Sequence, residues 1–495
     1  MNQPANKTTR RTFIKTAATI AGAGIAGGLT GCGQPREKIQ PVEAVGPSAA
    51  QVERISARPV YAPAPLPAFH RGVYAPKLDK LRVAYIGTGG IGHYHLDKTT
   101  ELECVECPCY CDVDTQRMAR AAELFPNARP YQDYRRMLEV ERDNIDAVMI
   151  GTPDHHHYPA TMLAMRMGKH VYTQKPLAHT VWEARQLTEA ARRYKLATQM
   201  GNQGHALEGW RLVYEWVHSG AIGDITETHT WTDRPIWPQG MARPKEEDAV
   251  PENLDWDCWL GPAPLRPFKG PAPEQNAGPY HPFNWRGWWD FGCGALGDMA
   301  CHTMDGIFAV LDPGSPAWVE PIAATPITDE AFPTCSMLRW YFPATASRPA
   351  FISYWYDGGL KPRCPEALEL ERRLPDTGNL FLGTKGALLI TGDYLDSPRI
   401  IPETLMRQIG KPPQMLERSP GHVKEWVMAA MGQAPLDFPK SNFAYAGPFT
   451  EAVLLGNVAL RTGRRIEWDA ANLRVPNLPE ANQYISKTYR EGWRV

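Results

Sequence analysis

The sequence predicts an α/β fold: a Rossmann domain with a doubly wound parallel sheet over residues 81–204, followed by an α+β domain over residues 205–495. Three observations predict it. A strand-like run breaks into glycines near residue 87, helical and strand-like segments then alternate as far as residue 203, and after residue 205 an amphipathic helix leads into strand-like alternation. A chain of 495 residues, 43% hydrophobic and 22% charged, has room for both domains.

The first 32 residues carry the features of an export signal rather than of a folded domain. Arg10-Arg11 precedes a mild apolar run, Thr16–Leu29, as in twin-arginine signals, and the run ends in Leu29-Thr30-Gly31-Cys32, which resembles a lipobox. We therefore expect lipidation at Cys32 and a membrane-anchored lipoprotein on the periplasmic side. A membrane-spanning anchor is the alternative, but the run is short and rich in glycine.

Residues 33–80 are rich in Pro and Ala and lack sustained periodicity, which is typical of a tether. The formal net charge is −1 and no basic tract stands out, so nothing indicates a nucleic-acid partner.

A glycine-rich turn follows the first predicted strand, Arg82–Ile86. Its GxGxxG spacing lets the first glycine form a tight turn, the second approach a pyrophosphate and the third pack helix on strand. A helix-compatible segment, Ile91–Thr99, follows, so phosphates would lie on free N–H groups at its N-terminus. A glycine turn without a nucleotide is the alternative. The cofactor-binding residues predicted here are Gly87, Thr88, Gly89, Gly90, Ile91 and Gly92.

The second predicted strand, Val105–Cys111, ends in Asp112, which lies 25 residues beyond Gly87. A dinucleotide fold places a carboxylate there on the ribose hydroxyls of the adenosine half. Because an acid at this position disfavours a 2′-phosphate, the sequence predicts NAD rather than NADP. Pro108 weakens the strand prediction, since proline cannot donate to a ladder. A solvated acid at a strand end is the alternative for Asp112.

Four cysteines cluster near this strand: Cys104, Cys107, Cys109 and Cys111. The last three alternate along the strand, so their side chains would share one face in a row instead of converging tetrahedrally. We therefore expect a buried strand face here and no metal site.

Helices and strands keep alternating beyond Asp112. Parallel strands deliver the residues that follow them to one edge of the sheet, so Thr88, Asp112, Thr152, Lys175 and Asn202 are expected to line one crevice. The predicted helices are 115–125, 134–139, 158–168 and 181–194, and the predicted strands are 146–150, 170–173 and 197–200.

The glycine turn, Asp112, the loop Gly151-Thr152-Pro153-Asp154-His155-His156-His157 and the string Gly168–Leu177 together resemble the Gfo/Idh/MocA oxidoreductase family from about Leu81 to the C-terminus. The resemblance implies that Lys175 reaches the reactive carbon of the substrate and that its bond to Pro176 can be cis. The family's Glu-Lys-Pro is Gln174-Lys175-Pro176 here, which removes a charge beside the lysine and should change its pKa.

The resemblance also implies that the loop at residues 151–157 edges the cofactor and substrate pocket. A metal on its three histidines is disfavoured, because consecutive residues cannot all face one ion. The further cofactor-binding residues predicted on this basis are Thr152, Pro153, His155, His157, Gln174, Lys175 and Asn202.

A second motif lies in the later domain, where Asp298, His302 and Asp305 would share one helix face. It matches the family's Asp-x-x-x-His pattern, which implies that His302 is an acid/base and that Asp298 orients it or binds substrate. Imidazole suits proton transfer near neutral pH. A purely structural helix face is the alternative. The family also implies an open, largely antiparallel sheet, and the helix Pro448–Thr462 should pack near the first domain.

Nine of the sixteen tryptophans lie between Trp210 and Trp289. Indole faces suit the C–H faces of sugars, although tryptophan is equally a core residue. The substrate residues predicted here are Asp305, Trp288, Trp289, Arg286 and Tyr280.

The sequence therefore predicts an NAD-dependent oxidoreductase that acts on a carbohydrate or cyclic polyol by hydride transfer, with Lys175, His302 and Asp298 as catalytic residues and a homo-oligomeric assembly. Two alternatives stay open. One is an NAD-assisted glycosidase or lyase that works by transient oxidation and elimination, and the other is a sugar-binding lipoprotein without catalysis.

Overall fold

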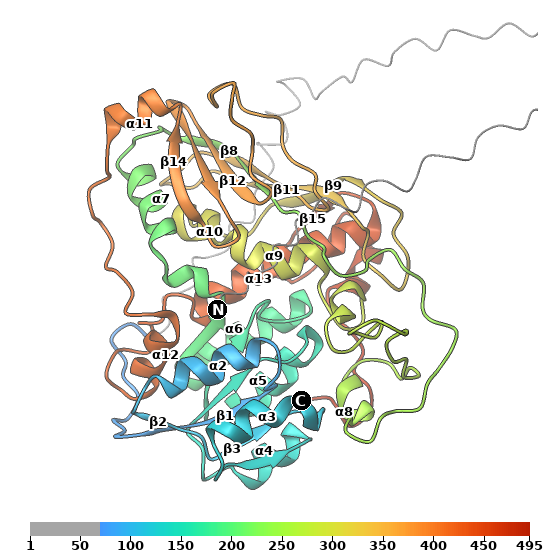
Figure 1. The fold of residues 1–495 in the computed structure, drawn as a ribbon. Coiled ribbons are helices and arrows are strands. Elements are labelled where there is room, and N and C mark those ends of the chain that lie inside the picture. Colours follow the sequence, from blue (N-terminus) through green and yellow to red (C-terminus); the bar gives the residue numbers. More distant parts are fainter. Residues whose placement is uncertain (1–69) are drawn as a thin grey trace, which may run out of the picture. The chain divides into compact units, whose positions relative to one another are not determined.

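The computed structural model describes residues 70–495, which form two sheets with their helices (Figure 1). The predicted signal, Cys32 and most of the predicted tether lie outside the described residues. Within the part of the chain that the structure describes, no helix is long and apolar enough to cross a membrane.

The first sheet is parallel throughout, with the strand order β4-β3-β1-β5-β6-β7 and β2 also paired to β1. The order reverses between β3-β1 and β5, and ligands of such sheets bind at that switch point. Its strands are β1 Leu81–Ile86, β2 Val105–Glu106, β3 Cys109–Cys111, β4 Arg129–Tyr131, β5 Ala147–Ile150, β6 His170–Gln174 and β7 Thr198–Gly201.

Helices connect these strands close to the predicted ranges. They are α2 Ile91–Thr100, α3 Ala119–Leu124, α4 Tyr134–Val140, α5 His157–Arg166 and α6 Val181–Tyr194, with short 3₁₀ turns at Thr115–Met118 and Asp154–His156. The start of α6 is fixed by a capping box, in which Thr180 and Glu183 satisfy each other's backbone N–H groups. The alternating pattern of the sequence is therefore confirmed as a doubly wound sheet.

The second predicted strand is wrong in one respect, because Pro108 divides it into β2 and β3. Proline lacks the N–H that a continuous ladder needs. The division also separates the cysteines: Cys109 and Cys111 are buried in one core cluster, whereas Cys107 packs against the other. Among the described residues, no group of three or more His, Cys, Asp or Glu side chains is placed to hold a metal ion.

The second sheet is mixed and mostly antiparallel, in the order β14-β13-β12-β8-β11-β10-β9-β15, and only the β8–β11 pair is parallel. Along β10, buried and half-buried residues alternate, as expected for a sheet with one covered face. The strands are β8 Ile225–Trp231, β9 Trp318–Ala324, β10 Ser336–Phe342, β11 Phe351–Tyr356, β12 Gly378–Gly383, β13 Gly386–Thr391, β14 Asp396–Ile401 and β15 Ile466–Glu467.

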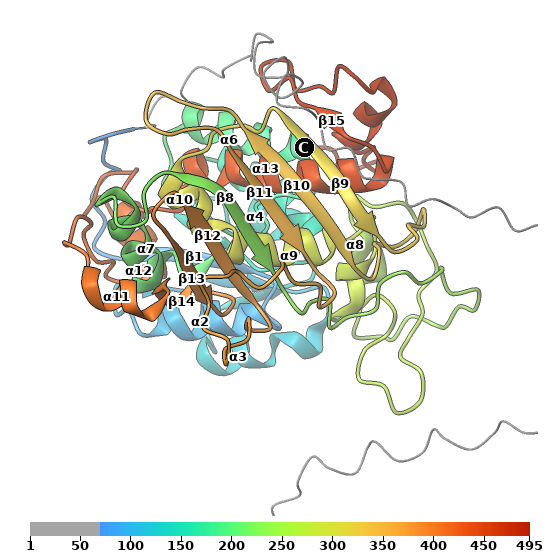
Figure 2. The ribbon, with the colours of Figure 1, turned by 90° about the horizontal axis from the view of Figure 1, so that it is seen from above.

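Helices cover one face of this sheet, as Figure 2 shows for α9, α10 and α13. The helices of this part of the chain are α7 Glu208–His218, α8 Trp256–Leu260, α9 Gly294–Thr303, α10 Asp305–Leu311, α11 Glu403–Ile409, α12 His422–Ala430 and α13 Phe443–Thr462.

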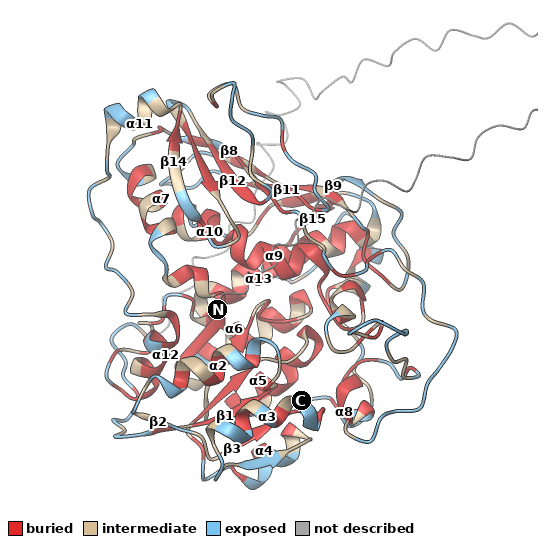
Figure 3. Cartoon of the chain, viewed as in Figure 1, coloured by how far each residue is buried: buried red, intermediate tan, exposed pale blue. Residues whose placement is uncertain are grey.

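Two late helices return to the first sheet. Trp426 of α12 lies in the same buried cluster as Leu81 and Val83 of β1, and α13 packs along α6, as predicted for the helix at residues 448–462. The two helices approach so closely that a Cβ on Gly447 would lie 1.8 Å from the Thr188 hydroxyl oxygen. Chain beyond residue 205 therefore contributes to the core of both sheets (Figure 3).

Candidate active site

A cavity of about 640 Å³ lies at the carboxyl ends of β1, β3, β5 and β6, facing α9. One of its ends is formed by the glycine turn, and the other by side chains from β6, α9 and the loops of the second half of the chain. Its volume is in the range of small-molecule and cofactor sites.

At two glycines of this end, Gly87 and Gly92, the backbone leaves no room for a side chain. Gly87 has a φ of 82°, and a Cβ there would lie 2.7 Å from the carbonyl carbon of Gly151. A Cβ on Gly92 would lie 2.3 Å from the Gly87 oxygen, so α2 packs directly on the turn. Gly90 and Ile91 line the cavity where α2 begins, and the first N–H groups of a helix have no partner within it. This end therefore has the form that a dinucleotide phosphate requires.

Asp112 lines the cavity beside this turn. Its Oδ2 accepts hydrogen bonds from the N–H groups of Thr88 (2.9 Å) and Gly89 (3.3 Å), and its Oδ1 accepts one from Asp114 (3.1 Å). Burial raises the pKa of Asp112, and these N–H groups oppose that rise. The Thr88 side chain itself is buried and does not line the cavity, so the expectation for this residue is corrected: its backbone holds Asp112 in place.

The motif loop after β5 contributes Thr152, Pro153 and one of the three histidines. That histidine is His156, whereas the sequence predicted His155 and His157. Both ring nitrogens of His155 lie about 3 Å from the Phe291 and Trp259 carbonyls, and those of His157 lie 2.6 and 2.9 Å from the Pro176 and Thr152 carbonyls. These two rings therefore tie the loop to its neighbours behind the cavity wall.

Gln174 lines the cavity next to Lys175, but Asn202 does not. The Gln174 Nε2 lies 2.8 Å from Nε2 of His95, a buried residue whose pKa is lowered by burial to about 3. A neutral amide suits this neutral imidazole, which gives a physical reason for the departure from the family's glutamate. Asn202 is corrected because it is buried between Asp305 and Ser441, to which it is hydrogen-bonded.

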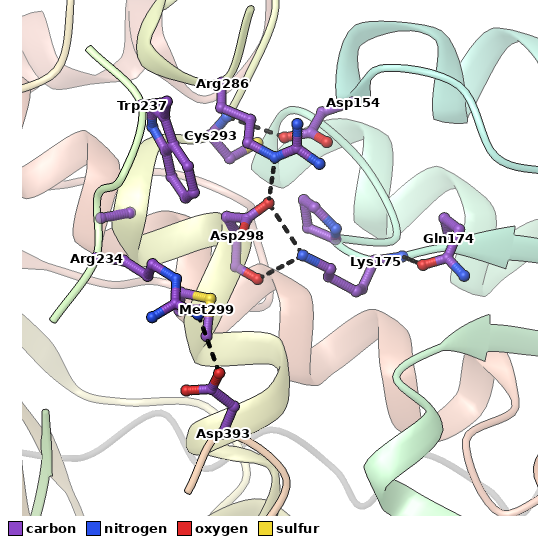
Figure 4. Close-up of polar contacts among 12 residues, drawn as sticks. Asp154, Gln174, Lys175, Arg234, Trp237, Arg286, Cys293, Asp298, Met299 and Asp393 are labelled. Atoms are coloured by element: carbon purple, nitrogen blue, oxygen red, sulfur yellow. Dashed lines mark hydrogen bonds and ion pairs between the residues drawn. The ribbon is translucent and has the colours of Figure 1, made fainter. Parts of the chain in front are cut away.

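Lys175 and Asp298 form the centre of the other end (Figure 4). The Lys175 Nζ lies 3.0 Å from Asp298 Oδ1 and donates to the Asp298 carbonyl at 2.9 Å, and the Lys175–Pro176 peptide bond is cis. The Arg286 Nε donates to the same Oδ1 at 3.0 Å. Although burial opposes it, these two cations hold the pKa of Asp298 well below its usual range. Asp298 therefore fixes Lys175 and Arg286.

His302 lies one turn further along α9 and also lines the cavity. Its ring is edge-on to Tyr394, with centroids 4.9 Å apart, and its Nδ1 is buried without a hydrogen-bond partner among the described residues. Burial, with a further contribution from Lys175, lowers the pKa of His302 to about 3. The imidazole is therefore neutral at physiological pH, and burial disfavours its protonated form. No hydrogen bond joins Asp298 to this ring, so of the two roles that the resemblance implies for Asp298, orientation of His302 has no such contact behind it and binding of substrate stays a prediction.

Comparison with known proteins agrees with this geometry. Residues 81–202 match the model of the oxidoreductase family with an NAD-binding Rossmann fold (Gfo/Idh/MocA), and residues 217–340 match that family's C-terminal α/β domain. The chain belongs to the Gfo/Idh/MocA family. Its first domain is thus an NAD-binding Rossmann domain.

Two curated proteins illustrate what this family member resembles in sequence. Glycosyl hydrolase family 109 protein 1 of Shewanella sp. (strain MR-4) is 35% identical over 164 residues, which are 31% of this chain and 35% of that protein. The alpha-N-acetylgalactosaminidase of Shewanella oneidensis is 34% identical over the same shares. The chain therefore matches about a third of the length of these curated relatives.

A solved structure shows the same fold over most of the chain. The WlbA dehydrogenase from Bordetella pertussis, in complex with NADH and UDP-GlcNAcA, has a TM-score of 0.55 and 17% identity, covering 80% of this chain and 99% of that one.

Sequence reasoning missed several acids in this family member's cavity, among them Asp154. Asp154 lies in the motif loop and lines the cavity, and its Oδ2 accepts a hydrogen bond from the Cys293 N–H at 3.0 Å. Burial, with repulsion from Asp298, raises the pKa of Asp154 to about 7. Its position directly after β5, within the family motif at residues 151–157, could have identified it as a site residue. Arg234 and Asp393, paired at 3.2 Å, come from loops that carry no such signal.

Four predicted substrate residues of this family member do not line the cavity, and only Arg286 does. Trp288 is fully buried and donates to the Pro279 carbonyl, Trp289 donates to the Thr328 carbonyl, and Tyr280 packs in the same aromatic core as Trp288. The indoles at the cavity are instead those of Trp237, Trp259, Trp285 and Trp493.

Asp305 is corrected for a different reason. The helix predicted to carry it ends at Thr303, and Asp305 begins α10. It is buried behind the cavity, where it accepts hydrogen bonds from Asn202 at 3.0 Å and from Tyr445 at 2.7 Å. Asp298 and His302 therefore share a face that Asp305 does not.

Proposed function

We propose that this chain is an NAD-dependent oxidoreductase that acts on a carbohydrate or cyclic polyol by hydride transfer. One observation carries the proposal: the glycine turn with Asp112 and the group formed by Lys175, Asp298 and His302 lie in one cavity. The name of the WlbA dehydrogenase structure, which holds NADH and a nucleotide sugar, supports it.

The residues at the glycine end fit the cofactor. Asp112 would hold the ribose hydroxyls, and the N–H groups of Gly90 and Ile91 would hold the phosphates. Thr152 and Gln174 would border its reactive end, since both line the cavity between the turn and Lys175. When bound there, NAD would supply the hydride acceptor.

The other end supplies proton transfer and orientation. A hydroxyl that is oxidised must lose its proton, and the neutral imidazole of His302, which lines the cavity, would take it. Lys175, fixed by Asp298, would donate to the substrate oxygen and hold the carbon in position. Lys175, Asp298 and His302 lie together in one cavity, which favours a catalytic function over sugar binding without catalysis.

A second candidate function uses the same cavity for redox-neutral elimination. Transient oxidation of a sugar makes the neighbouring C–H acidic, a base removes that proton, and the glycosidic oxygen leaves with a proton from an acid. Water would then add to the double bond that is formed, and the hydride would return to the carbonyl carbon, so no net oxidation occurs. Asp154, whose pKa is raised by burial to about 7, would be partly protonated at neutral pH and could supply that proton. The names of the glycosyl hydrolase family 109 relatives support this candidate.

The fate of the hydride distinguishes the two candidates. Purified protein is given free sugars and aryl glycosides in parallel, with no electron acceptor, while near-ultraviolet absorbance of reduced nicotinamide and aglycone release are followed. NADH formation from free sugar supports the net oxidoreductase. Sustained aglycone release over many turnovers, without NADH accumulation, contradicts it and establishes the elimination reaction.

We further propose that the chain is exported by the twin-arginine route, lipidated at Cys32 and assembled as a homo-oligomer. The pair Arg10-Arg11 and the lipobox-like sequence support the first two. Folded export suits a protein that must acquire a nucleotide before leaving the cytoplasm. Sedimentation of residues 70–495 at several concentrations tests the assembly, and a monomer at every concentration would contradict it.

A further inference from the structure

A second cavity of about 240 Å³ lies beside α13 and shares no lining residue with the first. Its walls come from the start of α6, the loop at Trp289, Asp290 and Gly292, the last turns of α13 and the chain at residues 483–488. Nothing in the proposed reaction uses this cavity.

The cavity contains an arginine without an anionic partner. The Arg461 guanidinium lies between two aromatic rings, 4.8 Å from the Trp289 centroid and 4.2 Å from that of Tyr484. Among the described residues no acceptor is hydrogen-bonded to it and no carboxylate lies within 4 Å, while Asp290 and Asp329 act on it only at longer range. These two ring contacts hold the guanidinium in the cavity wall and leave its donors available to a ligand.

Asn457 lies one turn before Arg461, so both side chains reach the same side of α13. Its Nδ2 donates to the Cys293 carbonyl at 3.0 Å, which fixes the amide. The Oδ1 is then buried with no hydrogen-bond partner in the described part of the chain. An unpaired buried acceptor is costly, so it indicates a ligand that donates a hydrogen bond.

The remaining charges in the wall are already paired. The Lys487 Nζ lies 3.1 Å from the Glu183 carboxylate and 2.9 Å from the His179 Nδ1, and Asp290 is paired with Arg266. Arg461 is therefore the cation that a ligand would meet, which favours a single negative charge over a dianion.

We propose that this second cavity binds a small hydroxycarboxylate of the sugar-acid class. Its carboxylate would pair with the fork of Arg461, and a hydroxyl would donate to the Asn457 Oδ1. The chain at Gly292 and Cys293 separates this ligand from the catalytic cavity: Asn457 bonds the Cys293 carbonyl, and the Cys293 N–H bonds Asp154. Cys293 would thus be the single residue that links Asn457, which holds the ligand, to Asp154, which lines the first cavity.

Calorimetric titration of the full-length protein with D-glucuronate tests the proposal, with D-glucose and inorganic phosphate as comparison probes. Arg461→Gln should weaken glucuronate binding by about tenfold or more, because charged hydrogen bonds are lost. Arg461→Lys, which keeps the charge but loses the fork, should weaken it by a smaller factor. Arg464→Gln, at an exposed arginine just beyond α13, should leave it unchanged.

The melting temperature of each variant is measured beside its titration, and Arg461→Lys carries the test if Arg461→Gln does not fold. Tighter binding of glucuronate than of glucose or phosphate, lost at Arg461 alone, supports the proposal. Three results would overturn it: no heat from glucuronate up to about 10 mM, glucuronate binding that neither Arg461 variant changes, or phosphate binding of equal affinity. None of them depends on the proposed reaction.

Discussion

The two ends of the first cavity, the one of about 640 Å³, are built in different ways. The glycine end is made of backbone from one short stretch, where Gly87 and Gly92 leave no space for a side chain and Asp112 is held by the N–H groups of Thr88 and Gly89. The other end is made of side chains from distant segments, with Lys175 from β6, His302 from α9 and Arg286 from a loop. We therefore expect the first end to determine cofactor affinity and the second to determine turnover.

The largest effect is expected from the side-chain end. Lys175→Ala and His302→Ala should each lower turnover by about 10²- to 10⁴-fold, because each removes a group that positions or accepts a proton. Bound NAD should be retained, since neither residue lies at the glycine turn. Steady-state rates and nucleotide content are measured together, with exposed Lys411→Ala as the control. Loss of NAD from either variant would contradict the division of labour between the two ends.

The glycine end should show the converse. Asp112→Ala should weaken NAD binding by about ten- to a hundredfold, because hydrogen bonds to a charged group are lost, while turnover at saturating NAD changes less. Asp112→Asn, which keeps two of the acceptor sites, should fall between this variant and the wild type. Titration calorimetry measures both. An Asp112→Ala protein with wild-type NAD affinity would refute the role of this carboxylate.

Stability should fall as the pH drops below about 6.5, the unperturbed histidine pKa. Burial lowers the pKa of His95, His156, His302 and His422 to about 3 and that of His157 and His170 to about 4. The unfolded chain therefore binds more protons than the folded one between pH 6.5 and 3, so the free energy of unfolding decreases as the pH falls through that window.

Each of these histidines contributes about 1.4 kcal/mol per pH unit within the window. Asp154 and Asp357, whose pKa values burial raises to about 7 and about 6, have the opposite sign and offset part of this effect. Urea denaturation of residues 70–495 at pH 7.5, 6.5 and 5.5 measures the effect. A midpoint that does not move between pH 6.5 and 5.5 would show that these imidazoles are not buried in the neutral form.

A smaller effect, on the pKa of His95, is expected from a change at Gln174, which lies between the two ends of the cavity. Gln174→Glu would place a carboxylate 2.8 Å from the neutral His95 imidazole, so the histidine pKa should rise and the variant should gain a titration that the wild type lacks. Proton NMR of the His95 ring over pH 5 to 8 detects it, with Gln199→Glu as a control that places a carboxylate at another buried glutamine. A His95 that stays neutral throughout would contradict this explanation of Gln174.

The same comparison explains how much the sequence could predict. The glycine end follows from contiguous residues, so the turn, Asp112 and the parallel strands were predictable. The second, open sheet was predictable from the resemblance to the family. Local chemistry also explains the error at Pro108, which divides a strand whose alternation of cysteines looked continuous.

The side-chain end depends on packing that no local pattern records. Of three adjacent histidines only His156 lines the cavity, although all three are buried and each has a ring nitrogen close to a backbone carbonyl. Trp288 and Asp305 belong to buried networks. Asp154 could have been predicted as a site residue, because it is an acid in the motif loop that follows a strand of the parallel sheet. Its burial is visible only in the structure.

The smallest effect on the cavity is expected from the predicted anchor, which lies outside the described residues. Cys32→Ser should release the protein from the membrane fraction without changing its turnover, because the described residues that line the first cavity all lie at position 86 or later. Fractionation of cells that express each form tests it, with Cys364→Ser, at an exposed cysteine, as the matched control. A Cys32→Ser protein that stays in the membrane fraction would place the anchor elsewhere.

The most direct test of the account is a nucleotide titration of the wild-type protein, preceded by denaturation and mass spectrometry to detect any NAD that is retained through purification. We expect NAD to be either released on denaturation or bound on addition, and NADP to bind far more weakly because Asp112 would oppose a 2′-phosphate. A protein that contains no nucleotide and binds no added NAD would contradict the central claim that the glycine turn and Asp112 hold this cofactor.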